Sequence, residues 1–213
     1  MNDAGLKWLL IDSCGAVATL AVGRGKMTLA TETVAGRALS AEWPAALRKL
    51  SAIAAWKVNE LQAVGVVHGP GSFTGVRVGL AAAKGLCEAA GAKLIAVSRL
   101  EVLAEQGVAG GLAALDAGRD QFYVRDAGAE FLMGRDEFLT AARERPVVTP
   151  DEQVANIRAD AVLVELDATS ALPMVLKRWS EARFDDVALQ DANYVRSERD
   201  IYARQPLAGG SGK

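Results

Sequence analysis

Histidine and cysteine are scarce in this chain of 213 residues, which contains one histidine, His68, and two cysteines, Cys14 and Cys87. A single histidine excludes metal sites built on two or more histidine ligands and leaves only one candidate base for a serine or cysteine nucleophile. Two cysteines are too few for a disulfide framework, so we expect packed, reduced thiols. We interpret His68 as a structural residue at the end of a strand.

Long apolar runs and an excess of positive charge are also missing. No run approaches the roughly 18 apolar residues of a membrane span, and no signal-peptide pattern precedes the first predicted strand. The net charge is −2, whereas a protein that binds nucleic acid alone needs a basic face. We therefore expect a cytoplasmic protein without membrane contact, for which tRNA is a substrate only as part of a complex.

Glycine, by contrast, is concentrated in one stretch. Residues 69–79 read GPGSFTGVRVG and follow the apolar run 63–67, which predicts a short buried strand. The first three residues predict a tight turn, and Ser72 or Thr74 is suited to cap the helix that follows. The spacing fits neither the P-loop nor the dinucleotide fingerprint, although a helix N-terminus can hold an anion through its free N–H groups.

The helix predicted after this turn has a ridge almost without side chains, because Gly71, Gly75, Gly79 and Ala83 recur at every fourth position. Each interior glycine costs a helix about 1 kcal/mol relative to alanine, so close approach of another backbone, helix or ligand should account for them. A tightly packed core helix and an interface helix both fit, and we favour the interface. The predicted partner-binding residues are Phe73, Gly75, Val76, Arg77, Gly79, Leu80 and Ala83.

Periodicity and turn residues predict an α/β chain of two lobes. The first lobe, residues 1–106, has the order βββαβαβα, with helices starting near Ser40 and Ser98. The second, smaller lobe, residues 107–207, repeats the opening with an apolar strand from residue 112, an aspartate at its end and two further strands. Residues 208–213 are expected to be a disordered tail.

The two aspartates at strand ends, Asp12 and Asp116, have two interpretations. A carboxylate followed by small residues can hold a metal-bound phosphate between two lobes, or it can simply cap its own turn. Together with the glycine turn they would form a degenerate phosphate loop, whose predicted residues are Asp12, Ser13, Gly69, Gly71, Ser72 and Asp116.

Four motifs resemble the TsaB family, the non-catalytic subunit of the bacterial machinery for tRNA threonylcarbamoyladenosine synthesis. They are Ile11-Asp-Ser13, the 69–79 block, Val97-Ser98 and Leu115-Asp-Ala117. The similarity covers most of residues 6–125, is faint to about residue 188 and returns at Tyr194-Val-Arg196. It implies an actin-like, sugar-kinase-like (ribonuclease H-like) fold of two related lobes, each with a mixed sheet and flanking helices.

The resemblance also implies partners. TsaB pairs with TsaD, the transferase, through helices of the N-terminal lobe, and the ATPase TsaE binds the assembled pair. TsaD carries a metal-binding histidine pair that this chain cannot supply. A homodimer is the alternative in the absence of TsaD. We expect no catalytic residue, metal or cofactor.

Two other functions compete with this one. A kinase-like or ATP-hydrolysing enzyme would use Asp12 and Asp116 around a magnesium nucleotide, so weak binding of ATP and magnesium stays open. The third candidate is a protease, a label once attached to the wider family. The sequence shows no nucleophile–base pair that a protease would need.

Overall fold

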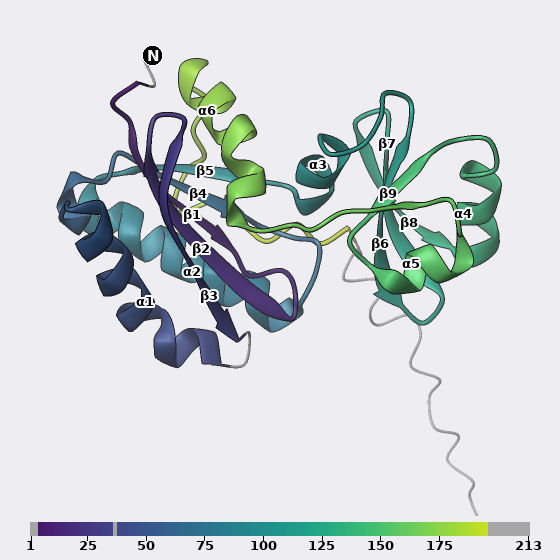
Figure 1. The fold of residues 1–213 in the computed structure, drawn as a ribbon, viewed down its shortest axis with the longest axis horizontal. Coiled ribbons are helices and arrows are strands. Elements are labelled where there is room, and N and C mark those ends of the chain that lie inside the picture. The colour runs from purple at the N-terminus through teal and green to yellow at the C-terminus, as the bar shows by residue number, and fades with distance from the viewer. Residues whose placement is uncertain (1–3, 36–37, 196–213) are drawn as a thin grey trace, which may run out of the picture.

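The computed structural model describes residues 4–35 and 38–195, so the predicted tail 208–213 and the last residues of the predicted second lobe lie outside it. The chain forms two lobes, each built around a five-stranded sheet, with helix α3 between them (Figure 1). The predicted α/β, actin-like class is confirmed by these two mixed sheets and their flanking helices.

The elements of the first half follow the predicted order. They are β1 (Lys7–Asp12), β2 (Val17–Arg24), β3 (Met27–Ala35), α1 (Leu39–Ala54), η2 (Val58–Glu60), β4 (Ala63–Val67), α2 (Phe73–Ala90), β5 (Lys93–Val97) and α3 (Arg99–Ala104).

The second half also begins with three strands. Its elements are β6 (Leu112–Gly118), β7 (Gln121–Asp126), β8 (Ala129–Gly134), α4 (Arg135–Ala141), β9 (Val147–Thr149), α5 (Glu152–Ile157), β10 (Val162–Leu163), η3 (Ala168–Ala171) and α6 (Leu172–Ser180).

The two sheets have the same topology, which confirms the repeat seen in the sequence. Counted from the antiparallel edge, the orders are β3-β2-β1-β4-β5 and β8-β7-β6-β9-β10. In each sheet the first strand pairs antiparallel with the second and parallel with the fourth. Strand β6 therefore occupies the place of β1, and Asp116 occupies the place of Asp12.

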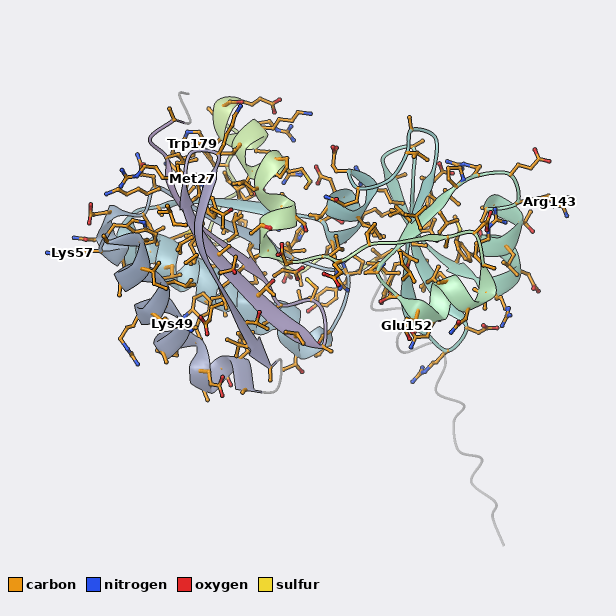
Figure 2. All side chains as sticks on the ribbon, in the orientation of Figure 1. Met27, Lys49, Lys57, Arg143, Glu152 and Trp179 are labelled. Carbon is orange, nitrogen blue, oxygen red and sulfur yellow. The ribbon has the colours of Figure 1, made fainter. Side chains whose placement is uncertain are left out.

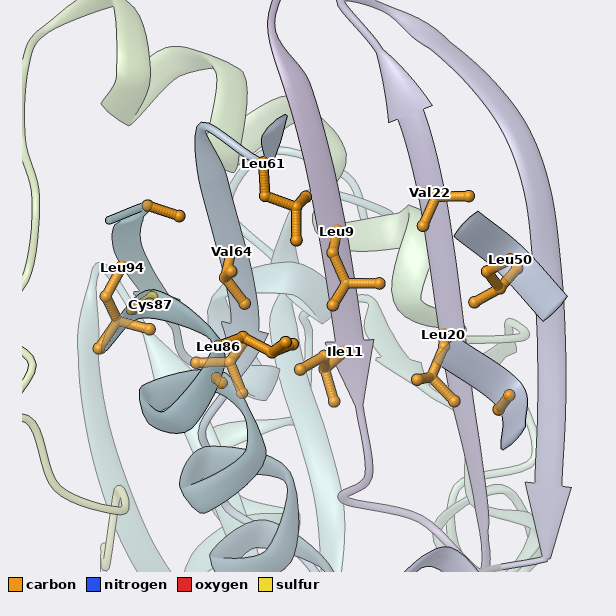
Figure 3. Close-up of a cluster of buried hydrophobic side chains, with 14 of the residues drawn as sticks. Leu9, Ile11, Leu20, Val22, Leu50, Leu61, Val64, Leu86, Cys87 and Leu94 are labelled. Atoms are coloured by element: carbon orange, nitrogen blue, oxygen red, sulfur yellow. The ribbon is translucent and has the colours of Figure 1, made fainter. Parts of the chain in front are cut away.

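The first sheet is covered on both faces because the side chains of β1 alternate between them. Leu9 and Ile11 point to the face that α1 and α2 cover, where they pack with Leu50 and Leu86 (Figure 3). Trp8 and Leu10 point to the opposite face. A strand buried on both faces has no polar alternation, and this explains the continuous apolar run of β1.

Helix α6 returns to the first lobe and covers that opposite face (Figure 1). Its Val175 and Trp179 are buried with Trp8, and Trp179 packs against Phe184 with the ring centroids 5.4 Å apart and the rings tilted by 58°. The predicted division at residue 107 falls between α3 and β6. The predicted second lobe of residues 107–207 is wrong for its last part, because apolar side chains from residue 168 onward complete the first lobe's core.

The helix starts were predicted with mixed success. Ser98 caps α3, since its hydroxyl accepts from the Leu100 N–H at 3.2 Å. Ser40 is not a cap, because α1 begins one residue earlier and its N-cap is Ala38, without a side-chain hydrogen bond. Within residues 4–35 and 38–195, no helix has the length and apolar character needed to cross a bilayer.

We predict that Trp179→Ala lowers the free energy of unfolding of the full chain by about 3–5 kcal/mol, because it empties a buried site between α6 and the first sheet. Urea unfolding followed by circular dichroism measures the change. Leu163→Ala is the control, since Leu163 is 53% exposed on β10 and should cost little. Equal small losses in both variants would contradict the assignment of α6 to the first lobe.

Candidate functional site

The glycine turn is held against the end of β1 by backbone contacts. The Ser72 N–H donates to the Cys14 carbonyl at 2.8 Å, and the Ser72 hydroxyl caps α2 by accepting from the Gly75 N–H at 3.2 Å. A methyl group at Gly71 would overlap the Cys14 carbonyl. Of the two predicted caps, Ser72 is confirmed.

The glycine ridge of α2 faces its own lobe. A methyl group at Gly75 would overlap the Ser13 carbonyl oxygen, and one at Gly79 would overlap the Ser13 hydroxyl. That hydroxyl donates to the Gly75 carbonyl at 2.8 Å. The ridge is therefore closed by the turn that follows β1, and its interpretation as a bare surface for a partner is wrong.

The seven predicted partner-binding residues separate accordingly into two groups. Phe73 and Arg77 are exposed. The other five are buried within the first lobe: Gly75, Val76, Gly79, Leu80 and Ala83.

The two strand-end aspartates act as turn caps. Asp12 Oδ1 accepts from the Cys14 N–H at 2.9 Å, and Asp116 Oδ1 accepts from the Gly118 N–H at the same distance. Each carboxylate thus binds the backbone two residues ahead, which favours the second of the two interpretations. In the described ranges, no group of three or more His, Cys, Asp or Glu side chains is placed to share a metal ion.

The glycine turn of the predicted phosphate loop lies against the turn after β1 and against the returning chain. Ser13 is 2% exposed, and a methyl group at Gly69 would lie 3.1 Å from the Asn193 carbonyl. The glycines are therefore explained by close packing of backbone on backbone, and phosphate binding by this loop stays a prediction.

A polar network joins the lobes, and sequence reasoning missed it. The Glu130 carboxylate on β8 accepts from Ser98, from Arg125 at 3.0 Å and from the Asn193 side chain at 2.7 Å. Ser98 and Asn193 come from the first lobe and from the returning C-terminal segment. Residues this far apart in sequence carry no local pattern that could have revealed the contact.

Arg99 lies beside this network, at the first position of α3. Its guanidinium approaches Gly15, and its charge acts on the carboxyl of Asp151 in the second lobe. Burial raises the pKa of Asp151, while the hydrogen bond from the Asp116 N–H and the Arg99 charge counter that rise only in part.

An aromatic and cationic cluster is exposed at the start of α2. The Arg77 guanidinium lies 3.8 Å from the centre of the Phe73 ring, and Arg77 Nε donates to the Tyr194 hydroxyl at 2.8 Å. The two rings are 6.0 Å apart. Phe73 stays 54% exposed although an arginine covers one of its faces. We call these three residues the Phe73 cluster.

His68 anchors the returning C-terminal segment, as expected for a structural residue. Its Nδ1 lies 3.1 Å from the Asp191 carbonyl, and its backbone carbonyl accepts from the Asn193 N–H at 2.8 Å. Burial lowers the pKa of His68, although the nearby carboxylates Asp185 and Glu130 oppose that shift.

Comparison with known proteins shows the family of this chain. Residues 31–155, more than half of the chain, match the family described as TsaD, tRNA N6-adenosine threonylcarbamoyltransferase. The chain belongs to the TsaD family. No curated protein sequence matches it.

Two solved structures share the fold of this TsaD-family chain. YeaZ from Pseudomonas aeruginosa is 21% identical, with a TM-score of 0.72 over 89% of this chain and 99% of that one. An uncharacterized protein with similarity to peptidase YeaZ from the same organism is 20% identical, with a TM-score of 0.73 over 90% and 100%. YeaZ belongs to the TsaB family. The predicted resemblance to TsaB is therefore confirmed at the level of the wider TsaD family and of the fold.

We predict opposite effects for two glycine-to-alanine changes in α2. Gly75→Ala should cost about 1–3 kcal/mol of stability, because the added methyl group collides with a fixed backbone oxygen. Gly85→Ala should add up to about 1 kcal/mol, because Gly85 faces open space and alanine favours helix. Urea unfolding of both variants measures the difference, and stabilisation by both would show that the ridge is not closed.

We predict that His68 titrates below its ordinary pKa of about 6.5. In the folded protein it stays neutral at a pH where the unfolded chain binds a proton, so stability should fall as the pH drops below about 6.5. As the single histidine, it gives one titrating imidazole signal by NMR. His68→Gln should reduce this acid sensitivity, and a midpoint at or above about 6.5 would contradict the burial.

Proposed function

We propose that this protein is a non-catalytic subunit of a tRNA N6-threonylcarbamoyladenosine synthesis complex and that it pairs with TsaD. Membership of the TsaD family and the YeaZ-like fold support the reaction class. The observation that carries the pairing is the outer side of α2.

This outer side is exposed and carries small residues at four positions, beside the exposed charged side chains of Arg77 and Glu88. Thr74, Ala81, Gly85 and Ala89 are solvent-exposed at helical spacing, opposite the closed glycine ridge. Small residues let the backbone of another helix approach closely. A helix of 18 residues with such a face can lie against a partner helix over several turns.

The Phe73 cluster gives this side of α2 an anchor. Tyrosine and arginine are enriched at interface hot spots, and a stacked guanidinium–aromatic group loses little side-chain freedom on binding. Its position at the first turn of α2 puts it at one end of the small-residue face. The proposed interface therefore consists of the outer side of α2 with the Phe73 cluster, in place of the closed ridge.

A non-catalytic role agrees with the hydrogen bonds that the candidate catalytic side chains of the two lobes make. The one histidine binds the C-terminal segment through Asp191, and its described hydrogen bonds include no serine or cysteine side chain. Asp12 and Asp116 are committed to their own turns. These contacts support neither a peptidase nor a metal-dependent phosphotransferase in this chain.

The remaining parts of the proposal follow from the pairing. TsaE would bind the assembled pair, tRNA would be reached only through the complex, and the protein would act in the cytoplasm. The isolated chain would use the same face of α2 in a homodimer.

The test measures binding to purified TsaD from the same source by calorimetry and size-exclusion chromatography. We expect a 1:1 complex, and we expect Phe73→Ala and Arg77→Glu each to weaken it by about 30-fold, the effect of a hot-spot residue of about 2 kcal/mol. Met27→Ala is the control, because Met27 is 63% exposed on β3. No complex would refute the pairing, and an unchanged affinity in both variants would refute the face.

A further inference from the structure

Strand β3 forms an open edge of the first sheet. Within residues 4–35 and 38–195 it pairs with β2 alone, and its nine residues make it the longest strand there. Figure 2 marks Met27 at its start. The outer N–H and C=O groups of an edge strand can form a ladder with another strand, so an unprotected edge is a site for strand pairing.

The other sheet edges of the described chain are covered or short. Asp185 covers the edge of β5, because its N–H donates to the Leu94 carbonyl at 2.9 Å and its carboxylate accepts from the Ala96 N–H at 2.7 Å. In the second sheet, β10 has two residues, and β8 has six and leads directly into α4. Among the described strands, β3 therefore offers the longest edge for pairing.

The side chains of β3 leave much of this edge unprotected. Proteins commonly protect an edge strand with lysine, proline or a bulge. The sequence MTLATETVA contains no lysine or proline, and its one charged residue, Glu32, is paired with Lys49 of α1 at 2.6 Å. A register shift makes the strand irregular at Leu29, which has no partner on β2, and residues 30–35 are regular.

A second copy of this chain fits the regular part of the edge. Two identical strands pair antiparallel about a two-fold axis, and opposite residues point to the same face of the sheet, so the axis passes a residue. An axis at Glu32 would oppose two carboxylates. An axis at Thr31 would bring the irregular Leu29 into the ladder, and one nearer either end would pair fewer residues. An axis at Thr33 pairs regular residues and sets Glu32 opposite Val34 of the second copy.

We propose that two copies of this chain join their first sheets through residues 31–35 of β3, with the two-fold axis at Thr33. The two sheets then form one continuous sheet across the dimer. Thr31 and Thr33 are exposed and β-branched, which suits them to a newly formed strand pair. This edge shares no residue with the outer side of α2, so the dimer does not depend on the proposed pairing with TsaD.

Sedimentation equilibrium of the full chain tests the dimer on an Arg77→Glu background, which removes the proposed contact through α2. We expect a concentration-dependent dimer. Thr33→Lys should raise its dissociation constant about fivefold or more, because one substitution sets two like charges face to face at the axis. Thr28→Lys is the matched control, since Thr28 is also exposed on β3 but lies beyond the irregular position.

A cross-link then locates the axis. Thr33→Cys on the same background sets two thiols opposite each other, whereas the positions of Thr28→Cys would lie about 30 Å apart along the ladder. The native Cys14 and Cys87 are buried. We expect a short bismaleimide to join two chains of Thr33→Cys and few of Thr28→Cys.

Three results would overturn the proposal. One is a chain that stays monomeric at all concentrations, which would leave the edge open or covered by another part of the same chain. Another is an equal effect of Thr33→Lys and Thr28→Lys on the dimer. The third is equal cross-linking of the two cysteine variants.

Discussion

The contact between the first turns of α2 and the turn after β1 determines how the first lobe is built. Gly71, Gly75 and Gly79 let the helix lie directly on the backbone of Ser13 and Cys14. The Ser13 hydroxyl and the Ser72 N–H then hydrogen bond across this contact. A methyl group at Gly71 or Gly75 would overlap a backbone carbonyl, and one at Gly79 would overlap the Ser13 hydroxyl.

This contact also decides which side of α2 remains available. Because the glycine side is closed, the exposed side is the opposite one. It carries small residues together with Arg77 and Glu88, and the Phe73 cluster lies at its N-terminal end. The turn after β1 also packs against the glycines of the predicted phosphate loop. A loop whose sequence resembles an anion site thus serves the close packing of the chain. The interface we propose and the close packing of the predicted phosphate loop have one physical origin.

The lobes are joined by a second, polar constraint. Glu130 collects hydrogen bonds from Ser98, Arg125 and Asn193, which belong to three separate segments. His68 holds the same C-terminal segment through Asp191. The returning chain, with α6 packed on the first sheet, adds a second connection between the lobes to the one through α3.

Local patterns alone determined most of the elements. Apolar runs and turn residues predicted strands in both halves, and the repeat of an apolar strand with an aspartate at its end predicted the matching topology that the two sheets show. Ser72 and Ser98 were recognisable as caps because a cap acts within three residues.

Tertiary structure alone decided where surfaces meet. The four-residue spacing of Gly71, Gly75 and Gly79 marks a close approach, but it is identical for a helix that packs on its own sheet and for one that packs on another protein. The return of Trp179 to Trp8 depends on segments that lie far apart in the sequence. Periodicity reports which side of an element is apolar, whereas only the folded chain shows what that side touches.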